Sequence, residues 1–170
     1  MTNANNLESG ATLELPDARR ADPHGLFSGL WLPLITPFRN NAVDHTALAR
    51  LVGHYAKTGI AGLVACGSTG EAAALDEAEQ LAVLETVLEA VQKAKPGLPV
   101  VMGLSGYHLA QTLVWVKTVS SYPIAGLLVP APHYIRPSQA GLLHWLEEIA
   151  GCVRRALDRV RHSPAHRGGD

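Results

Sequence analysis

The chain has 170 residues, of which 47% are hydrophobic and 17% charged, and its formal net charge at pH 7 is −1. This length and hydrophobic share suffice for one globular domain with a sizeable core, and they exclude a disordered chain. The near-neutral charge gives no general attraction to nucleic acid or to a membrane surface, and no stretch of sequence is long and apolar enough to span a bilayer.

The N-terminal segment, residues 1–25, is polar and lacks the apolar core of a secretory signal. We expect it to be a flexible lead-in, with order beginning near Leu26. The chain has two cysteines, Cys66 and Cys152. Cys66 lies inside an apolar run, where a buried thiol is expected rather than a disulfide, and this favours a reducing, cytoplasmic location.

The first predicted strand is the apolar run 29–37, which a proline closes. Asn40 and Asn41 predict a turn. Asp44 follows, where its carboxylate can cap a helix by accepting from free backbone N–H groups. Gly59 predicts the left-handed C-terminal end of this helix. Its expected buried face consists of Leu48, Leu51, Val52 and Tyr55.

The second predicted strand, 61–66, leads into the loop 67–71, whose sequence is GSTGE. Asp76 then begins a helix, and Glu79, three residues later, completes a capping box. A proline and a glycine at 96–97 end this helix. Its expected buried stripe consists of Leu81, Leu84, Leu88 and Val91.

Two further units follow the same order. One is a strand at 98–103, a loop at 104–108 and a helix near 110–119; the other is a strand at 125–130, a loop, and a helix that opens near Ser138. Four alternations of strand and helix predict an α/β fold of right-handed βαβ units with a parallel sheet. The spacing fits both a doubly wound open sheet and a barrel.

In parallel α/β folds the loops after the strands form the functional rim. Ser68 and Thr69 have hydroxyls and consecutive backbone N–H groups that can hold a carboxylate or phosphate, although a plain glycine turn before a helix gives the same pattern. The other candidates on the rim are Thr36, Tyr107, His133 and Tyr134.

Several candidates have simpler readings. Tyr134 can donate or pass a proton, but such a tyrosine often packs with a solvated hydroxyl. His133 is typical of a solvated loop histidine, and Glu71 of an acid in the first turn of a helix. The i, i+4 pair His162 and His166 has no further ligand cluster, so no metal site is predicted.

Three motifs occur in order: LITPF at 34–38, GSTGEA at 67–72 and PHYIRPSQ at 132–139. Together they resemble the dihydrodipicolinate synthase / N-acetylneuraminate lyase family of pyruvate-dependent class I aldolases, over roughly residues 26–150. The resemblance implies a (β/α)8 TIM barrel, of which the chain carries an N-terminal half: a truncated barrel of about four βα units.

The resemblance also implies roles for the rim. Thr69 and its neighbouring amides, with Gly70 and Thr36 beside them, would bind the carboxylate of pyruvate or another 2-oxo acid. Ser68 would be the first hydroxyl of a proton relay, and Tyr134 the relay tyrosine that family members lend to a neighbouring subunit. Ser68 stands where dihydrodipicolinate synthases usually have threonine, so the branch stays open. The chemistry needs no cofactor and no metal.

The family reaction requires a lysine that forms a Schiff base with pyruvate, on the sixth strand. The chain has lysines only at 57, 93, 95 and 117, all predicted in or after helices. The implied activity is condensation of pyruvate with aspartate semialdehyde in lysine biosynthesis, with this chain an inactive fragment by itself. Two alternatives stay open: an N-acetylneuraminate lyase-like or other 2-oxo acid aldolase branch, and a non-catalytic module that assembles with an intact homologue. The expected protein partner is a further copy of the chain or a homologue.

Residues 151–170 do not resemble the expected fifth strand. Their first part can prolong the preceding helix, and their arginines form no nucleic-acid reader motif. A frameshift near 151–153 is a further hypothesis, because the codons for 160–167, read one nucleotide later, can spell the family's fifth-strand tyrosine motif. We expect half a barrel to be marginally stable, aggregation-prone or dimeric, because inner-face residues such as Val64, Val101 and Leu128 lose cover.

Overall fold

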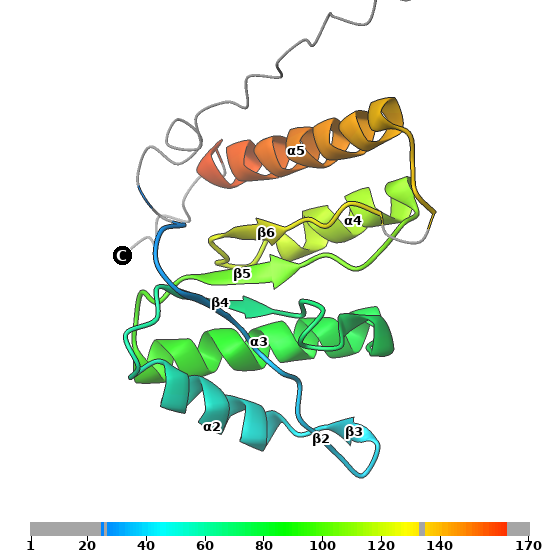
Figure 1. Cartoon of the computed structure of the whole chain (residues 1–170). Helices are drawn as coiled ribbons and strands as arrows, with labels where there is room; N and C mark the ends of the chain where they lie inside the picture. Colours follow the sequence, from blue (N-terminus) through cyan, green and yellow to red (C-terminus); the bar gives the residue numbers. More distant parts are fainter. Residues whose placement is uncertain (1–24, 26, 133–134, 163–170) are drawn as a thin grey trace, which may run out of the picture.

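The computed structural model describes residues 25, 27–132 and 135–162, and the side chains as far as residue 153. Each of the four predicted strands is followed by a helix, and all four strands join one parallel sheet in the order β1-β4-β5-β6 (Figure 1). The strands are β1 (Trp31–Pro33), β4 (Gly62–Ala65), β5 (Val100–Gly103) and β6 (Gly126–Leu128), and the helices are α2 (His45–Tyr55), α3 (Glu77–Ala94), α4 (Leu109–Val119) and α5 (Gln139–His162).

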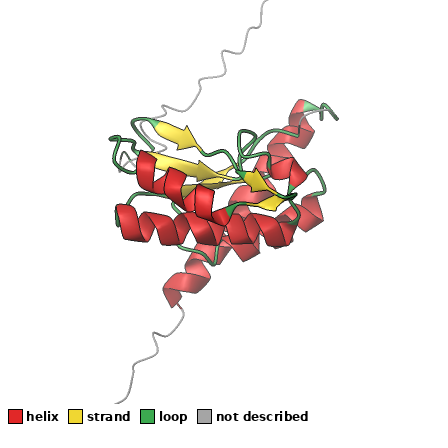
Figure 2. Ribbon diagram, turned by 90° about the horizontal axis from the view of Figure 1, so that it is seen from below, coloured by secondary structure: helices red, strands yellow, loops and turns green. Residues whose placement is uncertain are grey.

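The helices all lie on one side of this sheet, as the turned view shows (Figure 2). Alternate strand residues, such as Leu63 and Ala65 of β4 and Met102 of β5, point into the core that the helices cover. A doubly wound fold would place helices on both faces. The arrangement therefore confirms the parallel α/β prediction and favours an arc of a barrel, whose helices lie outside, over an open doubly wound sheet.

Helix starts follow the sequence signals. The Asp44 carboxylate accepts from the backbone N–H of Ala47 at 2.9 Å and begins α2. Asp76 and Glu79 form the predicted capping box: the Asp76 carboxylate accepts from the Glu79 N–H at 2.8 Å, and the Glu79 carboxylate accepts from the Asp76 N–H at 3.0 Å. Caps of this kind stabilise a helix by about 1 kcal/mol each.

Some boundaries differ from the prediction. Helix α2 ends at Tyr55, and Gly59 takes its left-handed conformation (φ +77°) four residues later, in the turn after the helix. The first strand is short, because the chain leaves the sheet after Pro33 and forms a hairpin of β2 (Phe38–Arg39) and β3 (Ala42–Val43). Asn40 and Asn41, both with positive φ, make its predicted turn, as expected of a type I′ hairpin.

The concave face of the sheet is better covered than expected. Val64 and Val101 are buried, whereas Leu128 is exposed as predicted. Two aromatic rings explain the difference: Trp31 lies against Gly62, Phe27 lies near Gly126, and the two rings contact each other at 5.5 Å between centroids. Gly126 is in register with Val101, and Gly62 is two residues before Val64 in β4, so both rings lie on the same face of the sheet as these valines.

Helix α5 continues from Gln139 through residue 150 to His162, so the first part of the tail prolongs the preceding helix. Trp145, Ile149 and Cys152 bury one side of this helix in the core. The Cys152 thiol donates to the carbonyl of Leu113 in α4 at 3.5 Å. Residues 1–24 and 163–170 lie outside the described part of the chain.

Close packing at Gly103 gives a direct test of the sheet. A Cβ atom at Gly103 would overlap the backbone carbonyl of Cys66 and lie 2.9 Å from the Cα atom of Gly67. Gly103→Ala should therefore destabilise the chain by about 1–3 kcal/mol in urea unfolding. Gly53→Ala is the matched control: nothing lies within 4 Å of a Cβ there, and alanine should stabilise α2 by roughly 1 kcal/mol. Equal stability of the two variants would contradict this packing.

Candidate functional site

The carboxyl ends of the four parallel strands lie at one edge of the sheet, where their loops meet (Figure 1). This edge brings together Thr36 after β1, the loop 67–71 after β4, Ser105 after β5 and Pro130 after β6. The predicted rim residues that the structure describes therefore share one side of the molecule.

The loop after β4 is a tight set of turns. The N–H of Gly70 donates to the carbonyl of Gly67 at 3.0 Å, and the N–H of Glu71 donates to that of Ser68 at 3.1 Å. Ser68 and Thr69 are exposed at the tip, and within the described chain their N–H and hydroxyl groups have no hydrogen-bond partner. Four donors on two consecutive residues suit a ligand that only accepts, such as a carboxylate.

The Thr36 side chain anchors this loop to the segment that follows β1. Its hydroxyl donates to the carbonyl of Gly70 at 2.7 Å, and the residue is 4% exposed. A Cβ atom at Gly70 would lie 3.0 Å from the carbonyl oxygen of Leu34, so glycine allows the loop to approach β1 closely. Because its donor is committed to Gly70, Thr36 positions the loop.

Left-handed backbones occur at both ends of the loop, at Cys66 just before it (φ +52°) and at Glu71, its last residue (φ +54°). Such conformations cost a non-glycine residue on the order of 1 kcal/mol or more, and they often occur at binding sites. Glu71 does not lie in the first turn of α3, as expected from its sequence position; it precedes a short 3-10 turn, Ala72–Ala74. Its acid therefore does not act on the dipole of α3, which begins at Glu77.

A cavity of about 300 Å³ lies beside the loop. Its walls are the end of β4, the loop itself, and the starts of the loops after β5 and β6. The residues that line it are Cys66, Gly67, Ser68, Glu71, Ala72, Ala73, Gly103, Leu104, Ser105, Leu128 and Pro130.

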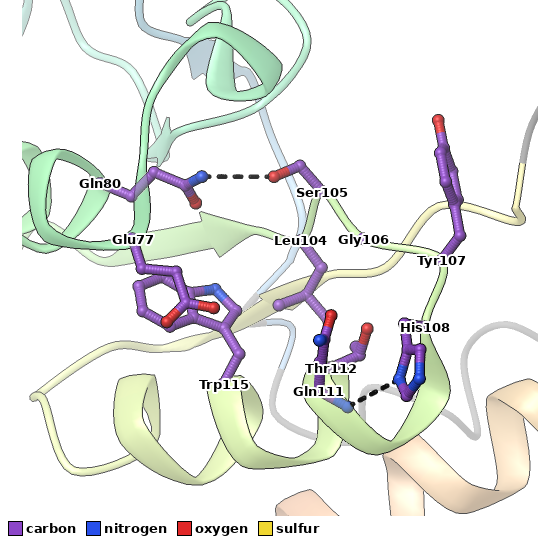
Figure 3. A pocket seen from close by; sticks show the side chains of 10 residues that line it. All are labelled: Glu77, Gln80, Leu104, Ser105, Gly106, Tyr107, His108, Gln111, Thr112 and Trp115. Atoms are coloured by element: carbon purple, nitrogen blue, oxygen red, sulfur yellow. Dashed lines mark hydrogen bonds between the residues drawn. The ribbon is translucent and has the colours of Figure 1, made fainter.

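A second cavity of about 360 Å³ shares Leu104 and Ser105 with the first and lies between the starts of α3 and α4 (Figure 3). Gln80 projects from α3 toward Ser105, and its side-chain N–H groups donate to the carbonyls of Ala72 and Leu75 at 3.1 Å each. Its carbonyl oxygen is buried and unpaired among the described residues. Gln80 thus fixes the segment that follows the loop.

Gln80 is not among the site residues predicted from the sequence. The only signal is a polar residue in the buried stripe of an amphipathic helix, one turn before Val83 and Leu84. Tyr107 lies on the loop after β5 and borders the second cavity. His133 and Tyr134 lie outside the described residues, so the position of the predicted relay tyrosine stays a prediction.

The four lysines lie away from the rim. Lys57 follows α2, Lys93 and Lys95 lie in and just after the last turn of α3, and Lys117 lies in the last turn of α4. All four are exposed. Each of these helix ends leads into the amino end of the next strand, so the lysines belong to the edge of the sheet opposite the loop 67–71.

In the described part of the chain no cluster of three or more histidine, cysteine or acidic side chains is arranged to hold a metal ion. None of the described helices combines the length and apolarity needed to cross a membrane. Cys66 and Cys152 are free thiols, and both are buried.

A sequence model of the Dihydrodipicolinate synthetase family matches residues 26–156. The 4-hydroxy-tetrahydrodipicolinate synthase of Magnetococcus marinus is 41% identical over 125 residues, which are 74% of this chain and 42% of that protein. The 4-hydroxy-tetrahydrodipicolinate synthase 2 of Clostridium acetobutylicum is 32% identical over 83% of this chain and 48% of its own length. The chain therefore spans less than half of the length of these relatives.

Solved structures agree on the fold. A monomeric dihydrodipicolinate synthase variant superimposes with a TM-score of 0.70 at 31% identity, over 76% of this chain and 42% of that one. The Proteus mirabilis N-acetylneuraminate lyase superimposes with a TM-score of 0.67 at 24% identity, over 75% of this chain and 43% of that one, a likeness of fold alone. The four βα units are thus part of a TIM-barrel fold.

The thiol of Cys66 gives a pH test of the site. Burial raises the pKa of Cys66 from its ordinary value of 9.0 to about 12. Between these two values the unfolded chain releases a proton that the folded chain keeps, so the free energy of unfolding should fall by about 1.4 kcal/mol per pH unit above pH 9. Urea unfolding at pH 8 to 10.5 measures this slope.

Cys66→Ala should remove this part of the slope, whereas Cys152→Ala serves as the matched control and should retain it. An equal slope in the chain with and without Cys66 would contradict burial of that thiol.

Proposed function

Since the chain belongs to the dihydrodipicolinate synthetase family, we propose that its loop 67–71 binds the carboxylate of pyruvate or a related 2-oxo acid. The observation that carries this proposal is the pair of exposed residues Ser68 and Thr69 at the carboxyl end of β4, where Ser68 lines a cavity of about 300 Å³. The chain then supplies the substrate-binding part of a class I aldolase site of the 4-hydroxy-tetrahydrodipicolinate synthase type.

In this proposal each residue has a separate role. Thr69 and the N–H of Ser68 hold the carboxylate. Gly70 lets the loop approach β1 closely, and the Thr36 hydroxyl secures this approach by donating to the Gly70 carbonyl at 2.7 Å. The Ser68 hydroxyl begins a proton relay that Tyr134 continues. A carboxylate held at this point leaves the neighbouring keto group directed away from the loop.

The carbon–carbon chemistry needs an amine. A lysine amine condenses with the keto carbon of pyruvate and releases water, and the resulting imine loses a proton from the methyl carbon to give the enamine that attacks an aldehyde such as aspartate semialdehyde. The exposed lysines of this chain belong to the opposite edge of the sheet, so we propose that these 170 residues are inactive alone.

Two other assignments are less well supported. An N-acetylneuraminate lyase-like activity is consistent with serine at position 68, but the relatives of 32% to 41% identity are synthases. A non-catalytic module that assembles with an intact homologue uses the same fold and differs only in having no turnover of its own. We further propose a cytoplasmic location, which two buried free thiols support.

Binding of pyruvate tests the role of the loop. In a titration followed by amide chemical shifts, pyruvate should move the signals of residues 68–72. Thr69→Val should weaken binding about ten- to a hundredfold, because a hydrogen bond to a charged group contributes roughly 1.5–3 kcal/mol. Thr118→Val, an exposed threonine near the opposite end of α4, is the matched control and should bind normally. Shifts confined to other parts of the chain would refute the assignment.

Borohydride reduction in the presence of pyruvate tests the absence of imine chemistry. The chain should show no covalent adduct by mass spectrometry, whereas a full-length synthase treated in parallel should be trapped. An adduct on Lys57, Lys93, Lys95 or Lys117 of this chain would show that it forms the Schiff base itself.

A further inference from the structure

The described chain exposes large apolar side chains at both margins of its sheet. Around β1 the exposed residues are Leu30 just before the strand, Ile35 just after it, and Phe38 at the start of β2. We call these three the β1 margin. At the other margin are Leu128 in β6 and Leu143 and Leu146 on the outer side of α5; we call them the β6 margin. Each of these six residues exposes between 41% and 68% of the surface that it would expose if it were fully accessible to solvent.

The two margins lie at opposite ends of the strand order. Within the described residues β1 pairs only with β4, and β6 only with β5, so each edge strand has a neighbour on one side. Figure 1 shows α5 at one limit of the molecule and α2 with the β2–β3 hairpin at the other. Unpaired edges with apolar neighbours are surfaces that proteins normally cover.

We propose that two copies of this chain associate about a two-fold axis along the barrel direction, with the β1 margin of each copy against the β6 margin of the other. A rotation about that axis keeps all strands parallel and covers both margins of both copies at once. Two sets of four parallel strands give the eight of a closed barrel. A partner that covered only one margin would leave the other exposed.

The area supports an interface of this kind. An aromatic side chain such as Phe presents roughly 150–250 Å², and leucine and isoleucine are somewhat smaller. At the exposed fractions given above, the six residues together present on the order of 500–600 Å² per copy. Stable interfaces begin at roughly 1,200 Å² in total, or about 600 Å² per partner. Pro33 lacks an N–H group, which removes one donor from β1, so side-chain packing contributes more here than the strand ladder.

This association does not depend on pyruvate binding, and the molar mass of the purified chain in solution tests it. The purified chain of 170 residues, measured by sedimentation or light scattering across a concentration series, should have twice its mass of 18.1 kDa. A monomer at all concentrations, or mass that keeps growing beyond the dimer, would overturn the proposal. So would a monomer that binds a separately supplied C-terminal half of a related synthase.

Single substitutions locate the interface. Leu143→Asp lies on the exposed side of α5, where an acid does not disturb the fold, and it should raise the dimer dissociation constant at least tenfold. Val114→Asp is the matched control, because Val114 is exposed on α4 and belongs to neither margin. Equal weakening by both substitutions, with helical circular dichroism retained, would count against the assigned margins.

Cross-linking separates this dimer from one formed through another surface, such as the loop around residue 134. Ile35→Cys and Leu128→Cys chains, mixed and treated with a short bis-maleimide, should give a covalent dimer containing both chains. The unsubstituted chain should not react, since Cys66 and Cys152 are buried. A dimer of the expected mass that never links positions 35 and 128 would overturn the proposal.

Discussion

The parallel register of four short strands is the constraint on which the rest of this structure depends. Pro33 lies beside Val64, Val64 beside Val101, and Val101 beside Gly126, so all four strands end at the same edge. The Thr36–Gly70 hydrogen bond acts within this register, because it joins the segment after β1 to the loop after β4. The exposed donors of Ser68 and Thr69 can meet one ligand only while these strands stay aligned.

Local signals in the sequence predicted the elements that local contacts determine. The cap at Asp44, the capping box of Asp76 and Glu79, and the turn at Asn40 and Asn41 all depend on residues within a few positions of each other. Four strand and helix pairs follow from the same short-range patterns, and the family motifs pointed to a barrel, which the structural comparisons support.

Long-range contacts explain what was missed. Val64 and Val101 are buried, although half a barrel was expected to leave this face uncovered, because Trp31 and Phe27 from the start of the chain lie on the same face. The Gln80 side chain hydrogen-bonds to Ala72 and Leu75, which precede α3, and to Ser105, which follows β5. No pattern of neighbouring residues in the sequence predicts these contacts. Thr36 was expected to bind a ligand, and only the structure shows its donor directed to Gly70.

Pro33 has a consequence for how the chain behaves when its margins are not covered. An edge strand of a sheet can recruit further strands without limit if every second residue offers a donor and an acceptor. The imide nitrogen of Pro33 interrupts that series at the middle of the edge segment 31–35. The β1 edge is therefore a poor template for a further strand, even where its apolar side chains are exposed.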